Sequence, residues 1–295
     1  MKIIQVANLT KIYSNGYGIY DIDLEVEEGR IFGYLGPNGA GKSTTIRTLM
    51  GYIKPNKGQS LINGLDTWTQ AALVQNDTGY LPGEISFPDN MTGWKFIKLI
   101  YNLRNQKNWA EVEKLIAYWE FNPNLKIKKM SKGMKQKVGL VIAFMHNPKI
   151  VILDEPTAGL DPLMQQKFVD TIQRAKANGQ TILMSSHIFE EVEKTCDEVA
   201  IIKSGRIISH VDLHELRSKN KRYYKITYGS DEFMQWSEFY TDKEKLTYIY
   251  NVKPEEVKEF FKKLANFKIE MVSEIPFSLE KYFMKFYKSE GESNV

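Results

Sequence analysis

The sequence contains one cysteine, Cys196, among its 295 residues. A single thiol cannot build an internal disulfide framework or a multi-cysteine zinc site, so both are excluded. The longest stretch without a polar side chain is only Val138–Met145, whereas a bilayer span needs about 20 such residues. We therefore expect no membrane-spanning segment. We also expect no secretory leader, because Met1–Val6 lacks the apolar core and cleavage site of a signal peptide.

A large excess of charge of either sign is also missing. The 40 Lys and Arg side chains against 36 Asp and Glu give a net charge of +4. This excess is too small to indicate nucleic-acid binding, so no nucleic-acid partner is expected. A solvated protein face is enough to explain the slight excess of basic side chains. Binding to a membrane surface or to an acidic partner protein stays an open alternative.

The first two thirds of the chain predict an α/β domain over residues 1–216. Short β-branched runs alternate there with helical stretches, which is the pattern of a mostly parallel sheet. The predicted strands are Ile3–Val6, Arg30–Leu35, Ile150–Leu153, Thr181–Ser185 and Glu198–Ile202. Ile150–Leu153 is apolar throughout, as expected of a strand that is buried on both faces.

The composition changes after the charged stretch Arg217–Arg222, because almost half of the aromatic side chains lie beyond it. Three strands and two helices are predicted there: Tyr224–Tyr228, Leu246–Tyr250 and Lys268–Val272, with Glu255–Leu264 and Ser278–Lys288. Residues 217–295 therefore predict a small α+β domain with a core of its own. It binds a ligand, regulates turnover or supports a dimer, and our hypothesis is the last of these.

A glycine-rich loop follows the apolar run Ile31–Leu35 and precedes the helical stretch Thr44–Met50, which is the context of a phosphate-binding loop. Glycines allow positive φ, so that successive backbone N–H groups turn towards phosphate oxygens, and the helix dipole adds positive potential. Lys42 supplies a mobile charge, and the Ser43 hydroxyl is a predicted Mg²⁺ ligand. The predicted nucleotide-binding residues of this loop are Gly36, Pro37, Asn38, Gly39, Ala40, Gly41, Lys42, Ser43 and Thr44.

Two acids, Asp154 and Glu155, end the strand Ile150–Leu153, and Pro156 prevents its continuation. The carboxyl ends of parallel strands face the ligand crevice. We predict that Asp154 holds the Mg²⁺ shell and that Glu155 orients and deprotonates an attacking water.

Met130–Lys137 precedes the apolar run Val138–Met145 and identifies a family. Its sequence, Met-Ser-Lys-Gly-Met-Lys-Gln-Lys, resembles the L-S-G-G-Q signature of the ATP-binding cassette (ABC) family, with Ser131 and Gly133 at matching positions. Lys132 and Met134 depart from the signature. The form is similar to that of the multidrug, antibiotic and peptide exporter branch. By this resemblance, Ser131 and Gly133 face the γ-phosphate that a second subunit holds; Ser131 is also a predicted helix N-cap.

Three further positions follow from the resemblance. Asp161, in Gly159-Leu160-Asp161, matches the loop that contacts the partner subunit. His187, after Ser185-Ser186, matches the switch histidine that senses the γ-phosphate, and we count it with Glu155 and Lys42 as catalytic. Tyr13 matches the aromatic residue that stacks on adenine, although Tyr17 and Tyr20 are close rivals on physical grounds.

The sequence departs from the family where a glutamine is expected after Tyr80-Leu-Pro82, because Gly83 and Glu84 stand there. Two alternatives follow. Either Glu84 replaces the glutamine at the Mg²⁺ shell, or the ligand is absent and the loop is only a hinge.

The resemblance implies a P-loop nucleotide hydrolase core with an antiparallel part, a helical subdomain at about residues 85–145, and ATP and Mg²⁺ as cofactors. It also implies a homodimer that closes on ATP and drives an integral membrane permease, with the chain peripheral on the cytoplasmic face. The cargo expected of that branch is a peptide, an antibiotic or another amphipathic compound. The aromatic stretches around Trp94–Leu103 and Val112–Trp119 then dock the permease or form a packed helical pair.

Two other functions compete with transport. A soluble ABC ATPase of the ribosome usually has two cassettes, and only one motif set is present. A chromosome-maintenance ATPase needs a coiled coil for which the 89 residues from Lys42 to Ser131 leave no room. A regulatory subunit with weak activity is the remaining alternative, because the signature and the Gly83–Glu84 loop are altered.

Overall fold

The computed structural model describes residues 1–219, 221–242 and 246–288, without the side chains of 285–288. The chain divides into two compact units, Met1–Val211 and Asp212–Val295. This division lies a few residues before the predicted boundary at 216, and residues 289–295 of the predicted second domain lie outside the described residues.

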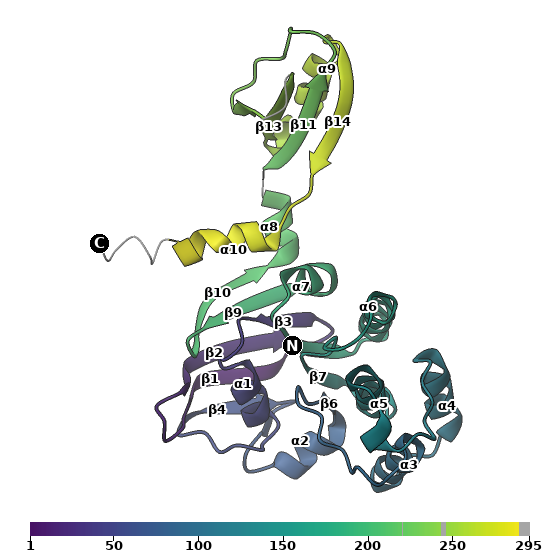
Figure 1. The fold of residues 1–295 in the computed structure, drawn as a ribbon. Helices are drawn as coiled ribbons and strands as arrows, with labels where there is room; N and C mark the ends of the chain where they lie inside the picture. Colours follow the sequence, from purple (N-terminus) through teal and green to yellow (C-terminus); the bar gives the residue numbers. More distant parts are fainter. Residues whose placement is uncertain (220, 243–245, 289–295) are drawn as a thin grey trace. The chain divides into compact units, whose positions relative to one another are not determined.

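A six-stranded sheet forms the centre of the first unit, in the order β10-β9-β3-β8-β7-β6 (Figure 1). The pairs β6/β7, β7/β8, β8/β3 and β3/β9 are parallel. Every residue of β3 and β7 is buried, as in a sheet covered on both faces. The predicted α/β class is therefore confirmed. The bounds are β3 Ile31–Leu35, β6 Thr78–Leu81, β7 Ile150–Asp154, β8 Thr181–Ser186, β9 Glu198–Lys203 and β10 Arg206–Asp212.

A second sheet of the first unit has the order β2-β1-β4-β5, and its neighbouring strands run antiparallel. The sequence predicted only part of β1 in this sheet. Inward side chains such as Ile4, Leu24 and Ile62 join Phe32 of the central sheet in one apolar core. The bounds are β1 Lys2–Ile12, β2 Gly18–Glu27, β4 Lys57–Ile62 and β5 Leu65–Asp66.

Helices α3, α4 and α5 gather beside the β6 edge of the central sheet, as Figure 1 shows. They cover both predicted helical stretches and the apolar run Val138–Met145, except that Trp119 and Met145 are the C-caps of α4 and α5. None of the helices in the described part of the chain combines the length and the apolarity that a bilayer span needs. The bounds are α1 Lys42–Leu49, α2 Ala71–Asp77, α3 Gly93–Leu103, α4 Trp109–Tyr118, η1 Ile127–Lys129, α5 Lys132–Phe144, α6 Pro162–Ala177 and α7 Phe189–Thr195.

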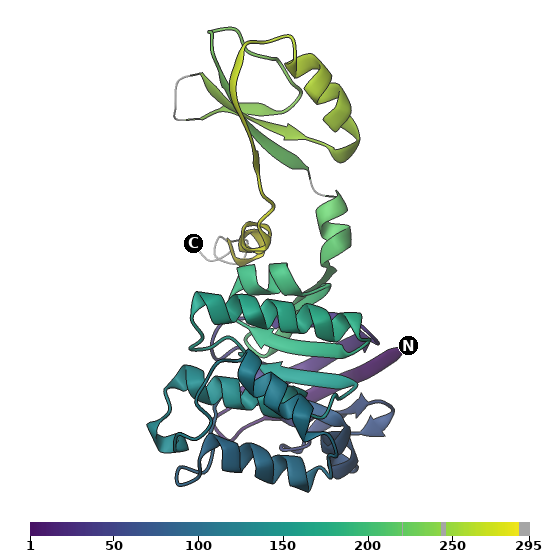
Figure 2. The same cartoon turned by 90° about the vertical axis from the view of Figure 1, so that its right-hand side faces the viewer.

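The second unit contains a four-stranded sheet in the order β12-β13-β11-β14. Helix α9 lies along one face of this sheet (Figure 2), where Phe260 and Leu264 are buried with Tyr224 and Tyr250. The aromatic residues concentrated beyond position 222 thus fill a separate core. The bounds are α8 Leu213–Lys219, β11 Arg222–Tyr228, β12 Phe239–Thr241, β13 Thr247–Val252, η2 Pro254–Glu256, α9 Val257–Leu264, β14 Ile269–Ile275 and α10 Leu279–Lys288.

Candidate active site

The glycine-rich loop connects β3 to α1 and turns through two residues with positive φ, Gly39 at 79° and Gly41 at 110°. Gly41 admits no side chain, because a Cβ atom there would lie 2.7 Å from the Ile19 side chain. Lys42 opens α1 and is buried. Its ammonium group donates to the carbonyl oxygens of Gly36 at 2.7 Å and Pro37 at 3.2 Å. The loop therefore presents a positive charge beside the N-terminal N–H groups of a helix, which is a setting for anions.

Asp154 and Glu155 are held at the end of β7 by a serine of the neighbouring strand. The Ser185 hydroxyl donates to Asp154 Oδ1 at 2.5 Å and accepts from the Glu155 backbone N–H at 3.1 Å. Glu155 has φ 50°, in the left-handed region that a residue with a Cβ adopts at a cost of about 1–2 kcal/mol. The strand end is therefore fixed in a strained turn that directs Glu155 away from the course of β7.

The three predicted catalytic side chains meet at one point, where Lys42 and His187 both contact Glu155. Lys42 Nζ lies 3.0 Å from Glu155 Oε1, and His187 Nδ1 lies 2.6 Å from Glu155 Oε2. Lys42 comes from the start of α1, Glu155 follows β7, and His187 follows β8. Because β7, β8 and β3 are parallel neighbours, their carboxyl ends bring these three residues to one edge of the sheet.

Gly83, not Glu84, lies against the buried Asp154 carboxylate. A Cβ atom at Gly83 would come within 2.9 Å of Asp154 Oδ2. The Glu84 side chain is 93% exposed, and its carboxylate lies 3.9 Å from Arg47 Nη2. The structure thus places Glu84 at the solvent-exposed edge of the site. Among the described interactions, none joins the Glu84 carboxylate to Asp154, so the prediction that Glu84 is a Mg²⁺ ligand gains no support from a contact.

A cavity of about 390 Å³ lies above the glycine-rich loop. Tyr13 and Tyr17 both line it, so two of the three candidate adenine-stacking residues remain. Tyr20 is absent from its lining and donates its hydroxyl to the Gly16 carbonyl. The lining residues are Tyr13, Tyr17, Gly18, Asn38, Gly39, Gly41, Lys42, Ser43, Thr44, Arg47, Gly83, Glu84 and Glu155.

The candidate signature begins helix α5. Ser131 is its N-cap and accepts from the Met134 backbone N–H at 3.2 Å, which confirms the capping prediction. Gly133 packs on the Gly159 carbonyl so closely that no Cβ atom would fit. Asp161 caps α6 by accepting from the Met164 N–H at 3.0 Å. The segments predicted to face a partner subunit therefore touch one another within one chain.

Sequence reasoning missed one side chain that ties the signature to the catalytic turn. Gln136 is buried in α5, and its amide donates to the carbonyl oxygens of Glu155 at 3.1 Å and Pro156 at 2.8 Å. Its only sequence signal is a glutamine within a basic stretch, which is usually solvated. The contacts of Gly83 and Ser185 with Asp154 are likewise evident only in the structure.

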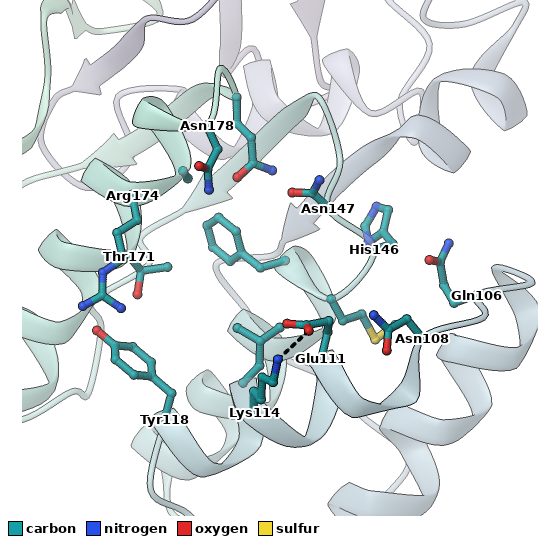
Figure 3. A pocket seen from close by; sticks show the side chains of 15 residues that line it. Gln106, Asn108, Glu111, Lys114, Tyr118, His146, Asn147, Thr171, Arg174 and Asn178 are labelled. Carbon is teal, nitrogen blue, oxygen red and sulfur yellow. Dashed lines mark hydrogen bonds and ion pairs between the residues drawn. The ribbon is translucent and has the colours of Figure 1, made fainter.

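A larger cavity of about 680 Å³ lies between α4 and α6, and none of the predicted site residues lines it. Figure 3 shows polar side chains around its rim, with the Glu111–Lys114 ion pair on one side and Arg174 beside Tyr118 on another. The Arg104 guanidinium group donates to His146 Nε2 at 2.9 Å. Burial, reinforced by the Arg104 charge, lowers the pKa of His146 to about 4, so this histidine is neutral at physiological pH.

Asp154 and Ser43, two side chains that we predict as Mg²⁺ ligands, both offer oxygen atoms. In the part of the chain that is described, no three His, Cys, Asp or Glu side chains cluster as metal ligands. Asp154 Oδ2 nevertheless lies against the backbone of Gly83, and Ser43 lines the cavity that Gly83 also lines. A carboxylate and a hydroxyl suit Mg²⁺, which keeps water and phosphate oxygens as its other ligands. The residues therefore fit the ion.

Comparisons with known proteins agree with this geometry. The family model described as "ABC transporter" matches residues 19–158. The uncharacterized ABC transporter ATP-binding protein YdbJ of Bacillus subtilis (strain 168) is 30% identical over 99% of both chains. The bacitracin transport ATP-binding protein BcrA of Bacillus licheniformis is 34% identical over 75% of this chain and 73% of its own. A solved ATP-binding subunit of an ABC transporter is 31% identical, with a TM-score of 0.66 over 73% of this chain and 92% of its own.

Proposed function

The chain belongs to the ABC transporter family of ATP-binding proteins and is an ATPase of that family; from this premise we propose that it powers a separate membrane permease as one half of a nucleotide-closed dimer. The observation that carries the proposal is the convergence of Lys42 and His187 on the two oxygens of Glu155, at 3.0 and 2.6 Å. A phosphate-binding cation, a carboxylate and a second polar group at one point are what attack of water on a terminal phosphate requires.

In this mechanism the backbone of residues 36–44 and the Lys42 ammonium group bind the phosphates of ATP, and Tyr13 stacks on the base. Glu155 orients the attacking water and accepts its proton as the bond to the γ-phosphorus forms and the bond to the leaving ADP oxygen breaks. His187 holds the Glu155 carboxylate and hydrogen-bonds the γ-phosphate. Asp154 and Ser43 would hold Mg²⁺, which neutralises the charge of the phosphates when it is bound.

We base the proposed dimer on the exposed N-terminus of helix α5. Ser131 is an exposed N-cap of α5, and the first N–H groups of that helix have no partners within the helix. We assign Ser131, Gly133 and Asp161 to the γ-phosphate and the catalytic turn of a second copy. Since ATP and ADP differ in that phosphate, it supplies the differential affinity that closes the dimer before hydrolysis and releases it afterwards.

We assign the permease contact to the helical subdomain. Leu99 and Leu103 of α3 lie one helical turn apart and are exposed by 41% and 69%, respectively, so they form an adjacent apolar pair on the surface of this helix. The transporter is proposed to be an exporter of amphipathic compounds, because the signature resembles the exporter branch and a relative is named for bacitracin transport. The chain then acts at the cytoplasmic face of the membrane.

Basal ATPase activity of the purified chain tests the enzymatic part of this proposal and separates it from a regulatory subunit with weak activity. Affinity purification of the tagged chain from detergent-solubilised membranes tests the rest. We expect a polytopic membrane protein to co-purify and a transported compound to stimulate hydrolysis. Co-purification with ribosomes, without any membrane protein, would instead support the soluble alternative.

Gly83→Ala is expected to raise the Mg²⁺ concentration for half-maximal ATPase activity about tenfold. The new methyl group would crowd Asp154 Oδ2 at 2.9 Å, and overpacking of this kind costs about 1–3 kcal/mol. Titration of ATPase activity with Mg²⁺ at saturating ATP measures the shift. Glu84→Ala is the matched comparison, because its exposed carboxylate contacts only Arg47 among the described ion pairs. A shift for Glu84→Ala but not for Gly83→Ala would favour Glu84 as the ligand.

Removal of the residues after Lys219 is expected to weaken nucleotide-dependent dimerisation about tenfold, or about 1.4 kcal/mol. In the described part of the second unit, β14 is an edge strand, and its Met271 and Val272 are exposed by 50% and 43%. Such an edge is suited to pair with another chain. Sedimentation with ATP measures the dimerisation constant of the full and the truncated chain, both carrying Glu155→Gln so that ATP is not hydrolysed. The melting temperature of each chain shows whether it is folded. Unchanged dimerisation would assign this unit another role.

A further inference from the structure

Glu191 carries a carboxyl group whose Oε1 atom is buried without a hydrogen-bond partner among the described residues, beside the loop of the proposed switch histidine. It lies in the first turn of α7, four residues after His187. The Thr195 hydroxyl donates to its carbonyl oxygen at 2.7 Å and fixes this turn. Its neighbour Glu190 is exposed and bonds Lys194 at 2.7 Å, in contrast. The proposed mechanism gives Glu191 no role, although burying a carboxyl group is costly unless it is well bonded.

The side chain of Glu191 holds the loop that carries His187. The Ser186 hydroxyl donates to Glu191 Oε2 at 2.5 Å and accepts from the Ile188 N–H at 3.0 Å. The Ser186 carbonyl oxygen accepts from the Gly36 N–H at 3.1 Å, at the start of the phosphate loop. Both chain neighbours of His187 are therefore fixed, one of them directly and the other through a shared hydroxyl group.

The same carboxyl group also adjoins the catalytic turn on the other side. Burial raises the pKa of Glu191, the hydroxyls of Ser186 and Thr157 lower it, and the charges of Glu155 and His187 raise and lower it, respectively. Thr157 lies two residues after Glu155, and its carbonyl oxygen accepts from the Leu160 N–H at 3.0 Å. Glu191 is thus bonded to the segment that precedes the proposed switch histidine and interacts electrostatically with the segment that carries the proposed base.

We propose that Glu191 is a positioning residue for hydrolysis, which through Ser186 keeps the His187 ring on the Glu155 carboxylate. The proposal rests on the proposed function. Without the Glu191 acceptor, the Ser186 hydroxyl loses its bond and the loop between β8 and α7 is free to shift. Displacement of a reacting group by about 1 Å can cost as much as 100-fold in rate, whereas ATP binding uses residues 36–44 and is spared.

Steady-state kinetics of three variants test this role. Glu191→Ala is expected to lower kcat roughly 10- to 100-fold with little change in KM for ATP. Glu191→Gln keeps an acceptor oxygen for Ser186 and is expected to restore most of kcat. Glu190→Ala removes an exposed carboxylate of the same helix turn and is the matched control, with wild-type kinetics. A purely structural role would lower the melting temperature without this rescue and without the split between kcat and KM.

A spectroscopic measurement separates this proposal from the proposed function. The sequence has four histidines, so the ring nitrogen signals of His187 can be assigned in ¹⁵N-histidine-labelled protein by comparison with a His187→Ala variant. We expect the Nδ1 signal of His187 to show its hydrogen bond in the wild type and in Glu191→Gln, and to lose it in Glu191→Ala. This result stands even if the wild type hydrolyses no ATP.

Ser186→Ala tests the same link from the other side and replaces Glu191→Ala if that variant does not fold. It is expected to lower kcat and to change the His187 signal in the same way. Wild-type kcat together with an unchanged His187 signal, in Glu191→Ala or in Ser186→Ala, would overturn the proposal.

Discussion

Replacing Glu155 by glutamine is expected to lower kcat for ATP hydrolysis by about 10²–10⁴-fold, which is the usual contribution of a general base. The amide keeps the size of the side chain and can still hydrogen-bond His187, but it cannot accept the proton of the attacking water. ATP binding depends on residues 36–44 and is expected to persist. Because the γ-phosphate is then never cleaved, the closed dimer should accumulate.

Size-exclusion chromatography with and without ATP, beside a coupled ATPase assay, measures both effects. We expect Glu155→Gln to elute as a dimer with ATP and as a monomer with ADP. Glu193→Gln, on α7 outside the candidate site, is the control for loss of one carboxylate and should behave like the wild type. Wild-type hydrolysis by Glu155→Gln would refute the assignment of the base, and an inactive variant that stays monomeric with ATP would refute the dimer.

The phosphate loop and the strand ends could be predicted from sequence because each follows from local rules. Glycines that permit positive φ, a lysine that opens a helix and two acids after an apolar strand rarely occur together outside a phosphate-binding site. The structure places β3, β7 and β8 side by side in parallel. The meeting of Lys42, Glu155 and His187 then follows from topology, because the carboxyl ends of parallel strands share one edge.

The connections between these segments could not be predicted, because they depend on packing between distant parts of the chain. Gln136 contacts the Glu155 carbonyl across 19 residues, and Ser185 contacts Asp154 across 31. Nothing in the residues beside Gln136 distinguishes it from a solvated glutamine. Similarly, the resemblance left open whether Glu84 replaces the family glutamine at the Mg²⁺ shell, and only packing shows that the backbone of Gly83 lies against Asp154.

The antiparallel sheet was largely missed for another physical reason. The strand β2 alternates exposed and buried residues from Asp21 to Glu27, but its exposed positions carry acids that are rare in strands. A bulge in the β1/β2 register near Leu9 also interrupts the two-residue period. A strand with one solvent-exposed face is hard to identify in a sequence without knowing the strand it pairs with. The buried strands of the central sheet, in contrast, are evident from their apolar composition alone.

Lys42→Ala is expected to weaken ATP binding by at least about 100-fold while the protein stays folded. The ammonium group is buried against the Gly36 and Pro37 carbonyls and the Glu155 carboxylate. Each bond that it transfers to a phosphate oxygen is charge-assisted and worth about 1.5–3 kcal/mol, so losing two of them exceeds the 2.8 kcal/mol or so of a 100-fold change. The variant also leaves Glu155 without its cation, which adds repulsion towards the phosphates.

Isothermal titration with ATP and Mg²⁺ measures the affinity, and thermal unfolding without nucleotide shows whether the fold persists. Lys149→Ala is the matched control, because Lys149 is exposed and directly precedes the first residue of β7, whereas Glu155 follows the last. We expect the control to bind ATP like the wild type. ATP should also raise the melting temperature of the wild type and of Lys149→Ala but not of Lys42→Ala, since a ligand stabilises only a fold that binds it. An unchanged ATP affinity in folded Lys42→Ala would mean that the glycine-rich loop does not hold the phosphates through this ammonium group, and the role of Glu155 beside it would then lose its support.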